Sequence, residues 1–217
     1  MTTIRHHLDD ATLVSYTSGA LTNSMALVVA CHLSVCGECR KRCGEMEVLG
    51  GEMLERLQPV DLSDAALQNL LDALDGEEAS EPTPKAPSPP PADVPAPLWP
   101  YIDKPLDELA WKSLAPGFAY VDLPCQGTGA SKLLRIAPGK SVLPHTHTGN
   151  ELTMVLRGSF VDEVGRFASG DIADIDDAIE HQPLVDSPET CICLIATDGP
   201  LRFTSLLGRI VQPLTGF

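Results

Sequence analysis

A run of prolines divides this chain and limits what it can fold into. Eight prolines fall between Pro82 and Pro97. Proline lacks a backbone N–H and fixes φ, so this stretch cannot form the interior of a helix or a central strand, and it favours extended polyproline II. We therefore predict an α + β protein of two domains, residues 1–80 and 99–217, joined by a linker over residues 81–98.

The segment before the prolines has the spacing of helices. Leu8 to Leu21 and Ser24 to about Gly50 carry apolar residues at helical intervals. Ser63 is suited to cap a further helix. Its apolar stripe has the spacing i, i+3, i+4, i+7 and consists of Leu67, Leu70, Leu71 and Leu74. Such a short bundle, of about 75 residues, buries a marginal core, which a structural metal would stabilise.

His32, Cys36 and Cys39 form a His-x3-Cys-x2-Cys pattern within the second helical stretch. Positions i, i+4 and i+7 fall within about 60° of one another on an α-helix, so one helix can present all three side chains to one ion. Imidazole and thiolate together favour a closed zinc site with four ligands. The fourth ligand must come from elsewhere, and His6 and His7 are the nearest candidates.

Other cysteines compete for these roles. Cys43 lies seven residues after Cys36, so it could replace His32, whereas Cys31 is about 100° away from the ligand face. A Cys-x-x-Cys pair is also the redox motif of thioredoxin-like proteins. That motif needs a strand that leads into the start of a helix, and here the pair lies within a helical pattern, so we favour a metal site.

The segment after the prolines has the pattern of strands. Short apolar runs alternate with Pro, Gly and Asp turns, which is typical of an antiparallel sandwich or barrel. The runs that we predict as strands are Phe118–Leu123, Lys132–Ile136, Leu152–Leu156, Cys191–Ala196 and Arg202–Leu206.

A second group of metal-binding residue types lies in this β segment. His145 and His147 are two residues apart, which places both imidazoles on one face of a strand, and Glu151 returns to that face. Together with the distant His181, they suit zinc, manganese, iron, nickel or copper.

Two further cysteines lie in a predicted strand. Cys191 and Cys193 share one face, so that their oxidation could alter the shape of the barrel. The alternative is that they are two ordinary buried side chains.

The charge of the chain excludes some partners. The formal net charge is −15, and residues 1–81 hold 14 acidic and 5 basic side chains, a balance of −9. Binding to nucleic acid or to an anionic membrane is therefore not expected. Such a protein is suited to cover a basic surface on a protein partner.

Nothing in the sequence indicates passage into or across a membrane. The longest apolar run, Met25 to Cys31, is too short to cross a bilayer, and we find no cleavable signal peptide. Seven cysteines are an odd number, which fits ligands, buried thiols or redox sensors in a reducing compartment better than disulfides. We expect a cytoplasmic protein.

The β segment resembles the cupins, which are small double-stranded β-helix barrels. The first cupin motif is matched without a gap by Gly139-x5-His145-x-His147-x3-Glu151-x6-Gly158. The second motif is poorly kept: Asp176 and Ala178 stand where cupins have Pro and Gly, Val185 replaces the usual Asn, and only His181 remains. The resemblance implies His145, His147, Glu151 and His181 as ligands of a divalent metal, with zinc our first choice, and no substrate-binding residue.

The whole chain resembles the ChrR-type zinc-binding anti-sigma factors, which join a short helical zinc domain to a cupin. The opening Ile4-Arg5-His6-His7, the Leu33-Ser34 pair and the Cys-x-x-Cys-Arg ending of the triplet also match. The resemblance implies a zinc site in the helical domain. Its ligands would be His7, His32, Cys36 and Cys39, which leaves His6 and Cys43 outside.

The resemblance also implies a function. The helical domain would bind an extracytoplasmic-function sigma factor as a 1:1 heterodimer and keep it from core RNA polymerase. The cupin domain would be required for release in response to singlet oxygen or related oxidants. Leu67, Leu70, Leu71 and Leu74 are either part of the sigma factor contact or plain core.

The main alternative is an enzyme. Three histidines and a glutamate in a cupin also form the site of metal-dependent dioxygenases and diketone-cleaving enzymes. Because the second motif has drifted and an enzyme does not need the helical zinc domain, we predict a regulator without catalytic residues.

Overall fold

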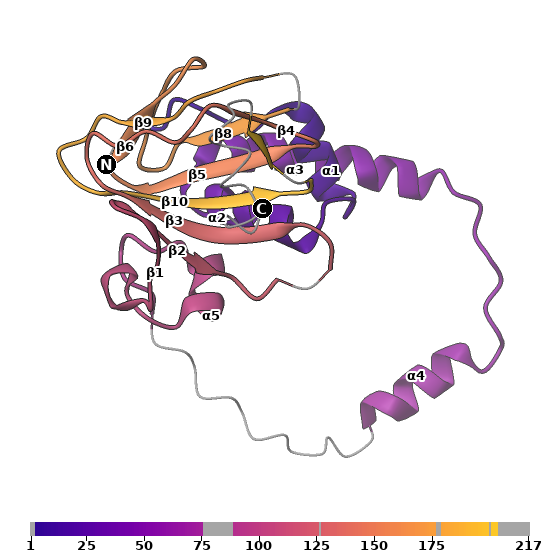
Figure 1. Ribbon diagram of the computed structural model, residues 1–217. Helices are drawn as coiled ribbons and strands as arrows, with labels where there is room; N and C mark the ends of the chain where they lie inside the picture. The colour runs from indigo at the N-terminus through magenta and orange to yellow at the C-terminus, as the bar shows by residue number, and fades with distance from the viewer. Residues whose placement is uncertain (1–2, 76–88, 126, 177–178, 200, 204–217) are drawn as a thin grey trace.

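The helices lie in the first half of the chain and the strands in the second, in the computed structural model shown in Figure 1. The structure describes residues 3–75, 89–125, 127–176, 179–199 and 201–203, without the side chains of His147 and of residues 201–203. The helices are α1 (Asp10–Thr17), α2 (Asn23–Val35), α3 (Gly37–Glu55), α4 (Ala66–Asp75) and α5 (Trp99–Ile102), with 3-10 helices η1 (Ala96–Leu98) and η2 (Leu106–Glu108).

The strands form antiparallel sheets. The largest sheet has the order β1-β2-β3-β10-β5-β8, and smaller sheets have the orders β7-β6-β9 and β11-β4. The strands are β1 (Lys112–Ala115), β2 (Phe118–Asp122), β3 (Ala130–Ile136), β4 (His145–His147), β5 (Glu151–Arg157), β6 (Ser159–Val161), β7 (Arg166–Ala168), β8 (Ile172–Ile175), β9 (Leu184–Val185), β10 (Cys191–Thr197) and β11 (Leu201–Phe203). The predicted order of helices and then an antiparallel β fold is confirmed.

The central strands β5 and β10 are buried on both faces. On β10, alternate residues enter two different apolar clusters: Cys191 and Cys193 belong to the interior of the β fold, whereas Ile192 and Leu194 belong to the cluster that includes the helices. A strand covered on both faces is a near-continuous apolar run, because neither alternate set of side chains meets water. The β sheet therefore needs a cover on its outer face.

Helix α2 supplies this cover. It contacts β10, β5, β3 and η1, and its buried side chains include Met25, Val28 and Val29. One apolar cluster continues from these residues into the sheet. Burial of each such side chain contributes about 1.5–3 kcal/mol, so the helices and the large sheet stabilise each other.

The end of the proline-rich segment joins this body. Val94 and Leu98 are buried, and Ala96–Leu98 form η1 against α2. The extended conformation predicted from composition therefore does not hold for the last of these residues, because they have an apolar surface to pack on. Residues 76–88, which include three of the eight prolines of the predicted linker, lie outside the described part of the chain.

The first predicted helical stretch is shorter in the structure than its sequence pattern, and the second is divided into two helices. The stretch from Leu8 to Leu21 yields α1 alone, over Asp10–Thr17. The stretch from Ser24 to about Gly50 is divided at Cys36, whose backbone is extended (φ −97°, ψ 107°), into α2 and α3. The prediction that one helix carries all three members of the His-x3-Cys-x2-Cys pattern is therefore wrong.

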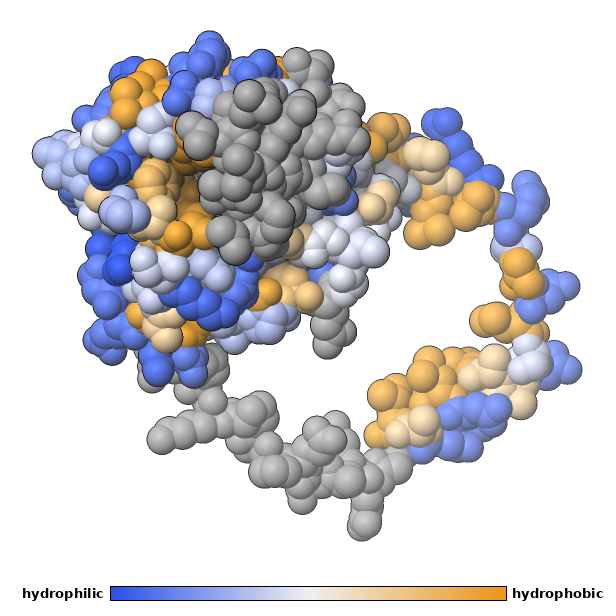
Figure 2. Space-filling model, viewed as in Figure 1, coloured by the Kyte–Doolittle hydropathy of each residue, from blue (hydrophilic) through white to orange (hydrophobic). Residues whose placement is uncertain are grey.

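Two apolar surfaces lack cover in the described structure. The first, the α4 face, consists of Leu67, Leu70, Leu71 and Leu74, which are 44–71% exposed. The second, the distal α3 face, consists of Val48, Leu49, Met53 and Leu54. Figure 2 shows both as apolar areas outside the β fold, and α4 stands apart from the body in Figure 1. The interpretation of the α4 leucines as plain core is wrong.

Two candidate metal centres

Four side chains of the helical segment converge on one point. The metal-binding atoms of His7, His32, Cys36 and Cys39 all lie within 4.8 Å of one another. His7 Nδ1 is 3.3 Å from Cys36 Sγ and 3.6 Å from Cys39 Sγ, and His32 Nε2 is 3.3 Å from Cys39 Sγ. We call these residues the N-terminal group.

The break between α2 and α3 creates this convergence. The N–H of Cys36 bonds to the carbonyl oxygen of His32 and ends α2. The same residue is the N-cap of α3, and its Sγ accepts a hydrogen bond from the N–H of Cys39 at 3.4 Å. His32 thus comes from the last turn of one helix and Cys39 from the first turn of the next.

Both histidines of the group have a partner on their second ring nitrogen. His32 Nδ1 is 3.1 Å from the carbonyl oxygen of Gly170, and His7 Nε2 is 3.3 Å from a carboxylate oxygen of Glu38. Both partners accept hydrogen bonds, so in each ring the proton is held on that side and the other nitrogen is left with a lone pair towards the group. Carbonyl and carboxylate partners of this kind orient the histidines of metal sites.

Burial keeps two members of the group, His32 and Cys39, uncharged without a metal. It lowers the pKa of His32 to about 4, so this imidazole is neutral at physiological pH. It also raises the pKa of Cys39 to about 11, so this thiol keeps its proton. A cation would reverse the second effect, since it stabilises the thiolate that ligates it.

The distances fit a tetrahedral ion. Zinc binds sulfur at about 2.3 Å and imidazole nitrogen at about 2.0–2.1 Å, which separates the two ligand atoms by about 3.5 Å. The nitrogen–sulfur distances of 3.3–3.6 Å in the N-terminal group agree with this separation. The group can therefore hold a metal ion.

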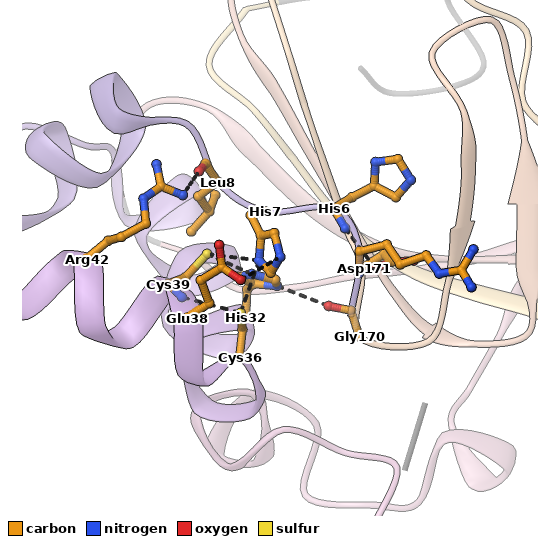
Figure 3. A network of polar contacts seen from close by, with 11 residues as sticks. His6, His7, Leu8, His32, Cys36, Glu38, Cys39, Arg42, Gly170 and Asp171 are labelled. Atoms are coloured by element: carbon orange, nitrogen blue, oxygen red, sulfur yellow. Dashed lines mark hydrogen bonds and ion pairs between the residues drawn. The ribbon is translucent and has the colours of Figure 1, made fainter. Parts of the chain in front are cut away.

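The segment that carries His7 lies on the β fold (Figure 3). Asp171 accepts hydrogen bonds from the backbone N–H groups of Arg5 and His6, at 2.6 and 3.0 Å. The N–H of Ile172 donates to the carbonyl oxygen of His6, and Ile4 crosses Gly170, where a Cβ atom would come within 2.9 Å of it. The same turn, Ala168 to Asp171, therefore supports His32 and the segment that carries His7.

The positions of His6, Cys31 and Cys43 decide whether these residues could replace members of the N-terminal group. The ring of His6 points away from the N-terminal group and packs at a tilt against Phe167, with ring centroids 4.2 Å apart. Cys43 is buried within α3 beside Glu47, and Cys31 is buried on α2 with its pKa raised to about 12 by desolvation. Among the described residues, the group that could hold a metal here contains neither of these cysteines.

A second group lies inside the β fold. Metal-binding atoms of His145, Glu151 and His181 lie within 4.8 Å of one another, and all three residues are buried. The Nε2 atoms of His145 and His181 are 3.0 Å apart. Thr153 donates a hydrogen bond to Glu151, and the Nδ1 of His145 faces the carbonyl oxygen of Leu143. We call these three residues the barrel group; they too could hold a metal ion.

The fourth predicted member of this group, His147, is described only in its backbone. It lies in β4 opposite Leu201 of β11. Glu151 is on β5, in a different sheet, so the prediction that it continues the face of the His145 strand is wrong. The chain turns between the two strands, and this turn brings the carboxylate to the histidines.

Asp162 supports the barrel group from the turn between β6 and β7. Its carboxylate is 3.1 Å from His181 Nδ1, and its side chain is fully buried. Burial opposes the charge on both partners, but their hydrogen bond and mutual attraction outweigh it, so the pKa of His181 is raised and the pKa of Asp162 is lowered. His181 therefore directs Nε2 at the group.

A small apolar cavity adjoins the barrel group. It has a volume of about 110 Å³ and is lined by His145, Glu151, His181 and mostly apolar side chains. Cys193 is part of its wall, with its Sγ 3.6 Å from that of Cys191. The hydrogen bond to Cys191 and then burial raise the pKa of Cys193 well above its ordinary value. The predicted shared face of these cysteines is confirmed, and it points inward.

Sequence reasoning missed the residues that support both groups. Glu38, Asp162, Gly170 and Asp171 carry no metal-ligand spacing, and Gly170 acts through its backbone oxygen. For Gly170 and Asp171 the only sequence signal is a turn between strands.

Fold and sites define a class: a helical module with a Cys2His2 group, packed on a barrel with a buried His and Glu group. Residues 104–201 match the family model described as the ChrR cupin-like domain. The chain is 44% identical to the anti-sigma-E factor ChrR of Cereibacter sphaeroides over 97% of its own length and 98% of that protein. It therefore belongs to the ChrR family of anti-sigma factors.

A solved structure supports the same family assignment. The crystal structure of Rhodobacter sphaeroides SigE in complex with the anti-sigma ChrR matches with a TM-score of 0.78 and 40% identity, covering 90% of this chain and 100% of that one. The family confirms the prediction of a regulator rather than an enzyme. Within the described residues, no helix is long and apolar enough to cross a membrane.

Proposed function

We propose that this protein is an anti-sigma factor that binds an extracytoplasmic-function sigma factor as a 1:1 heterodimer and keeps it from core RNA polymerase. The observation that carries the proposal is the likeness, over nearly the whole chain, to a protein named as an anti-sigma-E factor and solved in complex with SigE.

The contact surface that we propose comprises the α4 face and the distal α3 face. Both expose apolar side chains with no cover among the described residues, which is unusual for a surface without a partner. An amphipathic helix such as α4 is suited to a groove on a partner, where its leucines would act as anchors. The excess of acidic side chains in residues 1–81 would meet the basic surfaces by which a sigma factor binds DNA.

We further propose zinc as the metal of the N-terminal group. Two thiolates and two imidazoles are the usual ligands of structural zinc, and here all four ligand atoms lie within 4.8 Å of one another. Held there, zinc would fix the segment with His7, the end of α2 and the start of α3 as one unit. The helices that carry the contact surface would then keep their relative orientation.

For the barrel group we propose a second divalent metal, with His147 as the fourth ligand and zinc as our first choice on ligand type. Its role would be structural or sensory. Release of the sigma factor in response to singlet oxygen or related oxidants would then depend on the cupin domain, and Cys191 and Cys193 beside the group are the redox candidates.

We place the domain boundaries at residues 1–80, 81–98 and 99–217, as the sequence predicts, with the end of the middle segment packed on α2. We place the protein in the cytoplasm. RNA polymerase works there, and a diffusible oxidant reaches a sensor there.

Co-purification with a candidate sigma factor tests the proposal. Wild type and the fragment of residues 1–85 should retain the sigma factor, and the double variant Cys36→Ala/Cys39→Ala should lose it. Tyr101→Ala, a change to an exposed residue of α5 outside both surfaces and both metal groups, serves as the control. A wild-type protein that retains no sigma factor would rule the function out, and a fragment that fails would rule out residues 1–80 as a domain that binds the sigma factor by itself.

A further inference from the structure

The turn between β6 and β7 contacts a histidine of the barrel group and also His6, the residue next to His7 of the N-terminal group. At its start, Asp162 accepts hydrogen bonds from the N–H groups of Val164 and Gly165 through Oδ1, at 2.9 and 3.1 Å. Through Oδ2 the same carboxylate meets the ring of His181. The orientation of a barrel-group histidine and the shape of the turn are therefore set by one buried side chain.

At its other end the turn holds His6. The carbonyl oxygen of Arg166 is 3.1 Å from His6 Nε2. The ring also lies directly on Gly165, where a Cβ atom would come within 3.1 Å of it, and on Phe167. A shift of the turn would therefore move this ring, because little free space separates them.

His6 is bonded directly to His7 of the N-terminal group. Its N–H donates to Asp171 and its carbonyl oxygen accepts from Ile172, so this stretch is held along β8 on one side. His7 in turn places Nδ1 3.3 Å from Cys36. Contacts thus run without a gap from His181 through Asp162 and His6 to His7.

We propose that the β6–β7 turn and His6 couple the two metal groups, so that metal in the barrel group strengthens metal binding in the N-terminal group. The inference rests on the proposed metal binding at both groups. A metal bound by His181 Nε2 fixes this ring and, through Asp162, the turn. The turn fixes His6, and His7 is then held ready for its own metal. His6 is a positioning residue, since its ring meets the turn and not the N-terminal group.

Linkage makes the coupling reciprocal. If the barrel metal changes the affinity of the N-terminal group, metal in the N-terminal group must change the affinity of the barrel group by the same factor. A sensor in the barrel would in this way alter the site that orders the helical module, without passing through the proline-rich segment.

Cobalt binding to the full-length protein tests the coupling. Cobalt bound by thiolates has a charge-transfer absorption that cobalt bound by nitrogen and oxygen lacks, so this band reports the N-terminal group alone. We would titrate cobalt against a competing chelator, for wild type and for Glu151→Ala, which removes a barrel ligand. The N-terminal affinity should be about five-fold or more lower in Glu151→Ala, the lower end of usual coupling factors.

The same pair of measurements in variants of residue 6 tests the route. We would measure the cobalt affinity of the N-terminal group in His6→Ala and in the double variant His6→Ala/Glu151→Ala. These two affinities should be equal, because the loss of Glu151 can no longer reach His7 through His6. His6→Phe keeps an aromatic ring beside Phe167 and lacks the nitrogen that faces Arg166, so it separates the hydrogen bond from packing and secures the test if His6→Ala folds poorly. Arg5→Ala, a change to the adjacent exposed side chain, should keep the full difference.

Each outcome is decisive. Equal affinities in wild type and Glu151→Ala overturn the coupling, and a difference that persists in both His6 variants overturns its route. Absence of the thiolate band in wild type would overturn the metal proposal itself and the coupling with it, and it is seen before any variant is compared.

Discussion

Four described histidines follow one rule, in that one ring nitrogen faces a metal group and the other faces an oxygen atom of the protein. The oxygen partners are a carboxylate or a backbone carbonyl in every case. The pairs are His7 with Glu38, His32 with Gly170, His145 with Leu143 and His181 with Asp162. Because the oxygen holds the ring proton, the chain sets each tautomer before a metal arrives.

Replacing Asp162 by asparagine tests this rule. The amide oxygen can keep the hydrogen bonds from Val164 and Gly165, but the NH2 group then faces His181 Nδ1 and favours a proton on Nε2. We expect the affinity of the barrel group for its metal to fall about 10–100-fold, measured by competition with a chelator. An unchanged affinity would mean that Asp162 serves only the turn; circular dichroism of both proteins checks that the fold is kept.

The raised pKa of Cys39 predicts proton release on metal binding. At about 11, this pKa leaves the thiol protonated at neutral pH in the metal-free protein, so zinc must displace its proton. Affinity should therefore rise with pH up to about 11, with at least about one proton released per zinc at pH 7–8. Zinc affinity measured across this range gives the number as its slope, and a flat profile would contradict a protonated Cys39.

The sequence predicted the ligands of the N-terminal group because their residue types and short spacing carry the signal. It could not predict their supports. Gly170 reaches His32 across 138 positions of sequence, and Asp171 reaches His6 across 165. Such pairs depend on how the helices pack on the sheet, which no local pattern specifies.

Among the secondary-structure elements, the sequence of β10 indicates its burial as well as its strand conformation, and only the strand was predicted. The run from Cys191 to Ala196 was predicted as a strand, and the observed strand spans Cys191–Thr197. Its near-absence of polar side chains also indicates cover on both faces, and helix α2 is that cover. The break at Cys36 was not predictable from periodicity, since the apolar pattern continues across it.

Helix η1 gives a stability test of the end of the proline-rich segment. Leu98 is fully buried in the cluster shared with α2, so Leu98→Ala should lower the free energy of unfolding by about 2–5 kcal/mol. Leu62→Ala, at an 82% exposed position, should change it by less than about 0.5 kcal/mol. Equal effects in urea denaturation would show that η1 belongs to a free linker.

The α4 face gives a binding test. In Leu67→Gln/Leu74→Gln the helix stays amphipathic but loses two exposed anchors, so unfolding of the free protein should be unchanged within about 0.5 kcal/mol. Affinity for the sigma factor should fall about ten-fold or more, since buried anchors contribute most of the binding energy. Calorimetry measures it, and an unchanged affinity would exclude this face.

At the scale of the whole molecule, one apolar cluster joins the helices to the barrel fold. Metal-loaded protein should therefore unfold in one thermal transition, seen alike by far-UV circular dichroism and by the fluorescence of Trp99 and Trp111. A chelator should lower its midpoint, because the folded state binds the metal more tightly than the unfolded chain does. Two separate transitions would show that the helices unfold independently of the barrel.

The position of the first residues along β8 also has a consequence for synthesis. His6 and Asp171 are 165 residues apart, so at about 5–20 residues per second the ribosome makes the acceptor roughly 8 to 33 s after the donor. During that interval the helices exist without their β support. The rate of translation through the β segment therefore sets how long the newly synthesised helical segment must bind its metal, or its partner, before the β fold is present.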